Sequence, residues 1–277
     1  MLKKIKKFFS NPDNYKNTYF IKYHLYKFFD RLFLSLHLKK INDNCQKDMF
    51  NWDKYHLHFR GEVLETSKTH SIKLAKKDYE LINNHLVKVN PGIKDIHPLH
   101  VITYETILRL NPESIFELGC GHGMHLHNMQ ILKPELKLAG IDRSAKQIEF
   151  LRETFPGLRA EIEIKDATIP FGESIYSKYD LSFTNAVIMH IHFADTHKTA
   201  LANLFNVSKK HVLMAERWKN HDYMSDILEL QEKKIIKWEK IHFYYKRCEN
   251  SDMYIMICSK EQLPYPVLDN YGLLPKN

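Results

Sequence analysis

The stretch IFELGCGHG, residues 115–123, is the part of the sequence that decides the fold. An apolar run leads into glycines at alternate positions, Gly119, Gly121 and Gly123, in a chain with only 9 glycines among 277 residues. Glycine adopts backbone conformations that side chains forbid, and it lets a ligand approach the main chain closely. The pattern predicts a strand that ends in a tight turn against a ligand and continues into a helix.

Alternating strands and helices surround this turn. A helix is expected at 100–110. Strands are then expected at 114–118, 136–141, 161–165, 180–184 and 211–216, and helices at 124–132, 144–155, 196–207 and 222–238. The segments KIHFYYKRC and MYIMICS flank ENSD, which predicts an antiparallel hairpin. Strict alternation of strand and helix is typical of parallel sheets with right-handed crossovers. We expect an α/β fold: a seven-stranded, mostly parallel sheet with helices on both faces and a C-terminal antiparallel hairpin, preceded by a helical N-terminal region.

The charge distribution separates residues 1–40 from the rest of the chain. Residues 1–40 contain ten basic and two acidic side chains, which equals the net charge of +8 of the whole chain. The other 237 residues are balanced, so the basicity is no nucleic-acid footprint across the whole protein. We expect a basic, aromatic helical extension at 1–40, a helical cap region at 41–98 and the catalytic domain at 99–277.

The extension mixes lysines with phenylalanines and tyrosines, and three roles suit that mixture. Packing over the catalytic domain or a second subunit is favoured slightly. Contact with an anionic membrane surface comes second, because rings insert there while lysines meet phosphates. Stacking on single-stranded nucleic acid comes third. No pattern indicates an oligomeric state.

Apolar runs and cysteines exclude several classes of protein. No stretch approaches the roughly 20 apolar residues that a membrane span needs, and MLKKIKKFF is not followed by a signal-peptide pattern. The four cysteines form no CxxC pair, which argues against a disulfide scaffold or a structural zinc module. A cytoplasmic location is expected, with peripheral contact at the inner membrane surface through 1–40 left open.

Two aspartates complete a pattern with the glycine turn. Asp142 ends the second strand of the alternating region, and Asp166 follows the third in IKDAT. With ELGCGHG they resemble class I S-adenosylmethionine-dependent methyltransferases over about residues 95–260. The resemblance implies S-adenosylmethionine as cofactor, with the ribose hydroxyls on Asp142 and the adenine amino group on Asp166. It also implies cofactor contacts from the remaining motif residues, which are Glu117, Gly119, Gly121, Gly123, Arg143, Ala167 and Asn185.

The spacing of the glycines also bears on a nicotinamide cofactor. The turn reads GxGxG, and Met124 stands at the position where the dinucleotide fingerprint GxGxxG has its third glycine. Glu117, two residues before the first glycine, is unfavourable beside a pyrophosphate and favourable beside a cationic ligand. For Asp142 and Asp166 taken singly, a helix N-cap or a turn is an equally good interpretation.

The segment after the fourth strand carries the candidate base. YDLSFTNAVIMHIH resembles a histidine-containing segment of small-molecule methyltransferases, and His190 matches that histidine. A histidine that titrates near neutrality suits proton removal from a hydroxyl acceptor. The alternative is a histidine that only packs or bonds the backbone, and His192 is a second candidate for the base. Asn185 is not part of an NPPY-like motif, which argues against methylation of exocyclic or amide nitrogens.

The remaining candidates concern the acceptor and metals. His100 and Tyr104 lie just upstream of the first strand, where contact with cofactor or substrate is expected. Glu216 and Arg217 end the fifth strand and could line the acceptor pocket, with a strand-terminal cap as the alternative. The 17 histidines match no metal-ligand spacing, so no metal is expected.

These residues favour O-methylation of a small polar acceptor, such as a sugar or nucleotide-linked sugar in surface-glycan biosynthesis. Three alternatives stay open: a nucleic-acid methyltransferase that uses the basic segment, a nicotinamide-dependent oxidoreductase, and a non-catalytic cofactor-binding protein. Nucleic acid is the less favoured partner, because no nucleic-acid-binding module is recognisable at 41–98.

Overall fold

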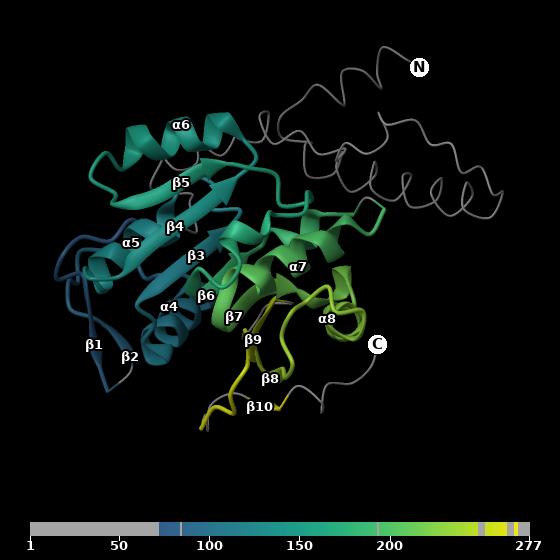
Figure 1. Ribbon diagram of the computed structural model, residues 1–277. Coiled ribbons are helices and arrows are strands. Elements are labelled where there is room, and N and C mark those ends of the chain that lie inside the picture. Colours follow the sequence, from purple (N-terminus) through teal and green to yellow (C-terminus); the bar gives the residue numbers. More distant parts are fainter. Residues whose placement is uncertain (1–71, 84, 193, 249–252, 265–268, 271–277) are drawn as a thin grey trace, which may run out of the picture.

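The computed structural model describes residues 72–83, 85–192, 194–248, 253–264 and 269–270 (Figure 1). The expectations for residues 1–40, and those for 41–71, lie outside the described residues.

The main sheet confirms the predicted architecture. Its strand order is β10-β8-β9-β7-β6-β3-β4-β5. The parallel strands are β3 (Ser114–Leu118), β4 (Lys137–Asp142), β5 (Ala160–Ile164), β6 (Tyr179–Asn185) and β7 (Ser208–Arg217). The predicted hairpin is formed by β8 (His242–Arg247) and β9 (Met253–Ser259), and β9 inserts antiparallel between β7 and β8. The two-residue β10 (Asp269–Asn270) extends the seven strands at one edge.

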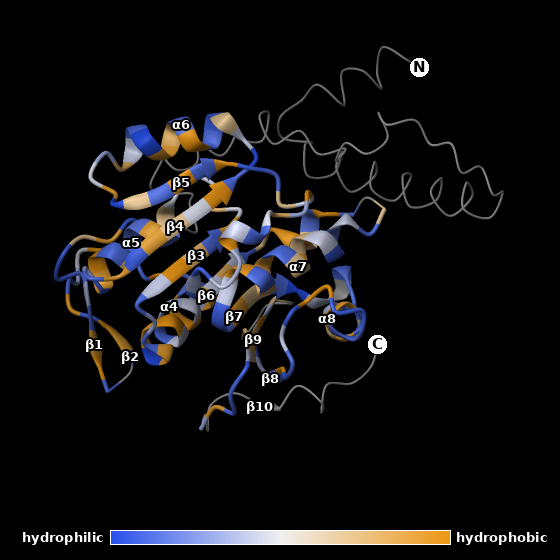
Figure 2. Ribbon diagram, in the orientation of Figure 1, coloured by the Kyte–Doolittle hydropathy of each residue, from blue (hydrophilic) through white to orange (hydrophobic). Residues whose placement is uncertain are grey.

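Helices cover both faces of this sheet, because its strands alternate apolar side chains between two cores. Ile115 packs with α4 (Pro98–Leu110), α5 (Met124–Leu132) and α6 (Ala145–Thr154). Phe116, the next residue, packs with α7 (Thr196–Val207) and α8 (Tyr223–Glu232) on the other face. Apolar residues run through the central strands, and the helices carry polar residues among the apolar ones (Figure 2). The connections include three short 3-10 helices, which are η3 (Glu173–Ile175), η4 (Ile188–His190) and η5 (Trp218–Asn220).

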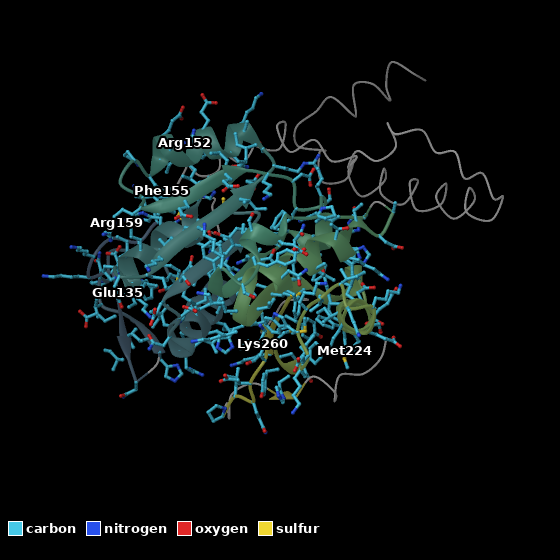
Figure 3. The ribbon with its side chains drawn as sticks, in the orientation of Figure 1. Glu135, Arg152, Phe155, Arg159, Met224 and Lys260 are labelled. Atoms are coloured by element: carbon cyan, nitrogen blue, oxygen red, sulfur yellow. The ribbon has the colours of Figure 1, made fainter. Side chains whose placement is uncertain are left out.

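Two contacts connect the region of α5 with the segment that follows α6. Phe155, labelled in Figure 3 just after α6, stacks on the ring of His127 at 4.3 Å. Arg159, labelled nearby, donates from Nη2 to the carbonyl of Pro134 at 2.9 Å. These contacts join α5 and the residues after it to the segment that follows α6.

The expectation of a helical region at 41–98 is wrong for part of its described stretch. An antiparallel pair forms there from β1 (Tyr79–Ile82) and β2 (His85–Lys88). Asn83 has φ 50°, which suits the turn between two short strands. The amide of Leu86 donates to Oε1 of Glu105 at 2.8 Å, which fastens β2 to α4. The sequence pattern of this stretch does not determine its secondary structure, which depends on tertiary contacts such as the bond to Glu105.

Two predicted helix boundaries also shift. The helix expected at 100–110 begins two residues earlier, at Pro98, where the missing N–H of proline is not needed. The helix expected to reach residue 238 ends at Glu232, and Lys234 then adopts φ 56°, a left-handed conformation that a helix cannot continue through.

Candidate functional site

The candidate site lies at the carboxyl ends of the parallel strands. Because these ends meet at one edge of the sheet, polar residues far apart in the sequence converge there. They are Glu117 in β3, Asp142 at the end of β4, Asp166 after β5, Asn185 at the end of β6 and Glu216 near the end of β7.

The three glycines of the turn differ in which described residues surround them: two face neighbouring side chains, and one faces open space. Gly119, Gly121 and Gly123 all have positive φ, at 78°, 53° and 77°. A Cβ on Gly119 would lie 2.5 Å from Cγ2 of Val187, and a Cβ on Gly123 would lie 2.5 Å from Cδ1 of Leu151. At Gly121, no heavy atom of the described residues comes within 4 Å of such a Cβ. The open side of Gly121 is therefore where a ligand can meet the backbone.

We expect Gly123→Ala and Gly121→Ala to differ in stability. The first adds a clash with Leu151 to a left-handed backbone, and it should lower the free energy of unfolding by about 3 kcal/mol. The second adds only the backbone strain, about 1 kcal/mol. Urea unfolding of both variants measures the difference. Equal losses would contradict the division of roles.

Glu117 is a buried carboxyl group without a partner. It is 1% exposed, and its Oε2 accepts no hydrogen bond from any described residue. Burial, together with the charge of Asp142, raises the pKa of Glu117 well above its usual range. A buried polar atom left unpaired is unfavourable, so this carboxyl group suits a ligand that brings a cation or a hydrogen-bond donor.

Asp142 joins the glycine turn to α6. Its Oδ2 accepts from the amide of Gly121 at 2.9 Å, and its Oδ1 accepts from the amide of Ser144 at 2.8 Å. Burial raises the pKa of Asp142, and these two bonds oppose the rise. Two carboxylate oxygens offer about four acceptor positions, so two remain for a ligand. Ser144 also caps α6, because its hydroxyl oxygen accepts a hydrogen bond from the amide of Gln147.

Asp166 is held in a local turn. Its Oδ1 accepts from the amide and the hydroxyl of Thr168, at 2.9 and 2.7 Å. Its Oδ2 lies 3.7 Å from Nε of the exposed Arg143. The next residue, Ala167, is also held, because its carbonyl accepts a hydrogen bond from Nδ2 of Asn203. The three aspartate and glutamate side chains on β3, β4 and β5 give this edge an acidic character, which matches a ligand with cationic and hydroxyl groups.

The segment that carries His190 lies against the glycine turn. It leaves β6 through Ala186, and Val187 covers Gly119 before η4 begins. Burial and the nearby Arg217 lower the pKa of His190 to about 4, so the imidazole is neutral at pH 7 rather than half-titrated as expected. Nδ2 of Asn185, at the end of β6, is buried without a hydrogen-bond partner among the described residues.

Glu216 lies beneath η4. Its carboxylate is 2% exposed and accepts from the amides of Val187, Ile188 and Met189 at 3.1, 3.2 and 3.0 Å. The hydroxyl of Thr184 donates to it at 3.1 Å. Burial raises its pKa to about 7, against the opposing effect of these bonds. Sequence reasoning offered a cap as one role for this residue, but no local signal points to a segment nearly 30 residues away.

Tyr104 and His100 are residues of α4, and their side chains contact α5. Tyr104 is fully buried, and its hydroxyl bonds Nδ1 of His125 at 2.8 Å and accepts from Nδ2 of Asn128 at 3.0 Å. The ring of His100 meets His125 edge-on at 4.7 Å. Asn128, which sequence reasoning missed, also accepts from the amide of Leu74. The structure thus places these residues in a buried polar network within the helix interface.

The other histidines of this edge also have structural contacts. His197 bonds Oδ2 of Asp226 at 2.9 Å and stacks on His221 at 4.0 Å, and the ring of His192 lies 5.4 Å from His221. Within the described ranges, no three His, Cys, Asp or Glu side chains gather as a metal site. The described helices include none that is long and apolar enough to cross a membrane.

Comparison with known proteins gives a family match. Residues 111–270 match a family model described as a methyltransferase domain. A TehB-like S-adenosylmethionine-dependent methyltransferase structure from Corynebacterium glutamicum is 17% identical, over 61% of this chain and 90% of that one, with a TM-score of 0.47. Magnesium protoporphyrin IX methyltransferase from Synechocystis is 16% identical, over 63% and 86%, with a TM-score of 0.44.

A curated relative matches locally. The tRNA N(3)-methylcytidine methyltransferase of Drosophila melanogaster is 42% identical over 76 residues, which is 24% of this chain and 23% of that protein. The match therefore spans about a quarter of the relative's length.

Proposed function

Because this chain belongs to the class I S-adenosylmethionine-dependent methyltransferases, a family of enzymes, we propose that it methylates a hydroxyl of a small polar acceptor. A sugar or nucleotide-linked sugar in surface-glycan biosynthesis is the acceptor class we favour. One observation carries the proposal: His190 ends the short helix η4, and Val187, the residue before η4, packs on Gly119 of the glycine turn. Family membership sets aside the nicotinamide and non-catalytic alternatives.

The acidic edge suits the cofactor of this family. S-adenosylmethionine supplies an electrophilic methyl group on a positively charged sulfur. We expect Asp142 to accept the ribose hydroxyls with its remaining lone pairs, and Asp166 to accept from the adenine amino group. The unpartnered Oε2 of Glu117 supports a role toward the ammonium group. Further contacts are expected from Gly119, Gly121, Gly123, Arg143, Ala167 and Asn185.

His190 orients the acceptor and takes its proton in this proposal. A neutral imidazole accepts a hydrogen bond from a hydroxyl and so aligns the oxygen with the methyl group. A pKa of about 4 makes His190 a weak base toward an alcohol. An alkyl oxonium is a far stronger acid than imidazolium, so His190 can still take the proton as the new carbon–oxygen bond forms. His192 is the second candidate for this role.

A nucleic-acid acceptor is the second candidate function. The local likeness to a tRNA N(3)-methylcytidine methyltransferase favours it, and the basic segment 1–40 offers phosphate contacts. Cytoplasmic location, and contact between residues 1–40 and an anionic membrane surface, belong to the first proposal. The membrane contact rests on the ten basic side chains that residues 1–40 mix with aromatic ones.

A labelled-methyl assay with three acceptor classes separates these functions. Full-length enzyme is incubated with labelled S-adenosylmethionine and either free and nucleotide-linked sugars, bulk tRNA, or buffer alone. We expect label in the sugar fraction, and we expect His190→Ala to lower turnover at least about 100-fold while affinity for S-adenosylhomocysteine changes less than about threefold. His192→Ala is made in parallel, and a larger loss of turnover there than in His190→Ala would assign the role to His192. Label in tRNA alone, or turnover that survives His190→Ala, would refute the first proposal.

A further inference from the structure

The short helix η4 is held from opposite ends by the end of β7 and by η5. At one end, Glu216 accepts from three consecutive amides, those of residues 187–189. At the other end, Nδ2 of Asn220 donates to the carbonyl of Met189 at 2.7 Å, and Nε2 of His221 donates to the carbonyl of Ile188 at 3.1 Å. Residues 216–221 therefore supply both the acceptor and the donors that η4 lacks as an isolated turn.

A strained residue directs these amides toward Glu216. Ala186 adopts φ 55°, and its amide donates to the carbonyl of Ala215 at 2.8 Å. A left-handed alanine is unfavourable and persists only where its surroundings impose it. Successive amides that point to one side form a site for an anion. Here the anion is the carboxylate of Glu216, which accepts the hydrogen bonds of the amides of residues 187–189.

The position of η4 affects both parts of the candidate site. Val187, whose amide Glu216 binds, packs on Gly119 of the glycine turn. His190 ends the same helix, one residue after Met189. A shift of η4 would therefore move the imidazole relative to the turn.

We propose that Glu216 is a positioning residue, whose carboxylate fixes η4 and so sets where His190 stands relative to the glycine turn. This inference rests on the proposed function for the chemical role of His190. It gives Glu216 a different role from lining the acceptor pocket, because its oxygens are directed to η4 and are not exposed.

Three variants of the full-length protein test the inference. Glu216→Ala removes both acceptor oxygens. Glu216→Gln keeps the size and one acceptor oxygen, and it preserves the test should the alanine variant fail to fold. Glu105→Ala is the matched control, because Glu105 also accepts from a backbone amide, that of Leu86, in contact with the remote β2 strand.

Two readouts follow η4 without an acceptor. The first is the imidazole NMR signal of His190 in protein with labelled histidine, assigned with His190→Ala. The second is hydrogen exchange of the amides of residues 187–189. We expect Glu216→Ala to move the His190 signal and to speed exchange at 187–189 at least about 100-fold more than in β3. Glu216→Gln should give a smaller change of the same kind, and Glu105→Ala should change neither readout selectively.

Two results would overturn the inference. One is a His190 signal and exchange at 187–189 that match the wild type in both Glu216 variants. The other is faster exchange spread evenly over the domain, as general destabilisation would produce. Failure of the proposed function looks different: the His190 signal would move in the Glu216 variants, yet His190→Ala would leave methyl transfer intact.

Discussion

Asp142→Ala lowers the affinity for S-adenosylmethionine at least about 100-fold, measured by calorimetry on the full-length protein. A factor of 100 corresponds to about 2.7 kcal/mol, and hydrogen bonds to a charged group contribute about 1.5–3 kcal/mol each. Asp142 is expected to lose two such bonds to the ribose. It also loses its bond to the amide of Gly121, which positions the open face of the turn.

Asp180→Ala is the control for this effect. Asp180 also accepts from backbone amides, those of Glu113 and Ser114, but it lies at the amino end of β6. Its loss should lower stability and leave cofactor affinity within about threefold. Unchanged affinity in Asp142→Ala, or an equal loss in Asp180→Ala, would contradict the ribose assignment.

Glu216 makes the stability of the domain fall as pH rises from about 4.5 to about 7. Its pKa is about 7 in the folded protein against 4.5 as its ordinary value, so the folded state binds more protons in this range. The free energy of unfolding therefore decreases with pH there, by about 3 kcal/mol in total, and the contribution is fully present only below pH 4.5. Glu216→Gln should remove this dependence.

Denaturant unfolding of wild type and Glu216→Gln at several pH values measures the difference between the two curves. Other titrating groups affect both proteins equally, so only the difference is attributed to Glu216. Parallel curves between pH 4.5 and 7 would show that the carboxyl group titrates normally and would contradict its buried, ionisable state.

The sequence predicts the elements that form from local patterns. The strand at 114–118 and the helix at 196–207 match β3 and α7, because an apolar run and a helical period each define them without distant contacts. The glycine turn and Ser144 are also recognisable, since turn and cap residues act over a few positions.

What the sequence does not predict depends on long-range contacts. The β1–β2 pair consists of four-residue strands that are fastened by Glu105 in α4. Glu216 bonds amides 27 to 29 residues away, and Tyr104 meets His125 across two helices. No local sequence pattern predicts contacts between residues so far apart in the chain. The packing of Val187 and Leu151 against Gly119 and Gly123 is a long-range contact of the same kind, and the glycine pattern does not reveal it.

A crystal structure of the full-length protein with S-adenosylhomocysteine bound would show directly which residues hold the cofactor. We expect the ribose hydroxyls within hydrogen-bond distance of the Asp142 carboxylate, the amino-acid part of the ligand over Gly121, and the sulfur facing His190 at the end of η4. A nucleoside bound away from Asp142, or a sulfur on the side opposite η4, would contradict these expectations.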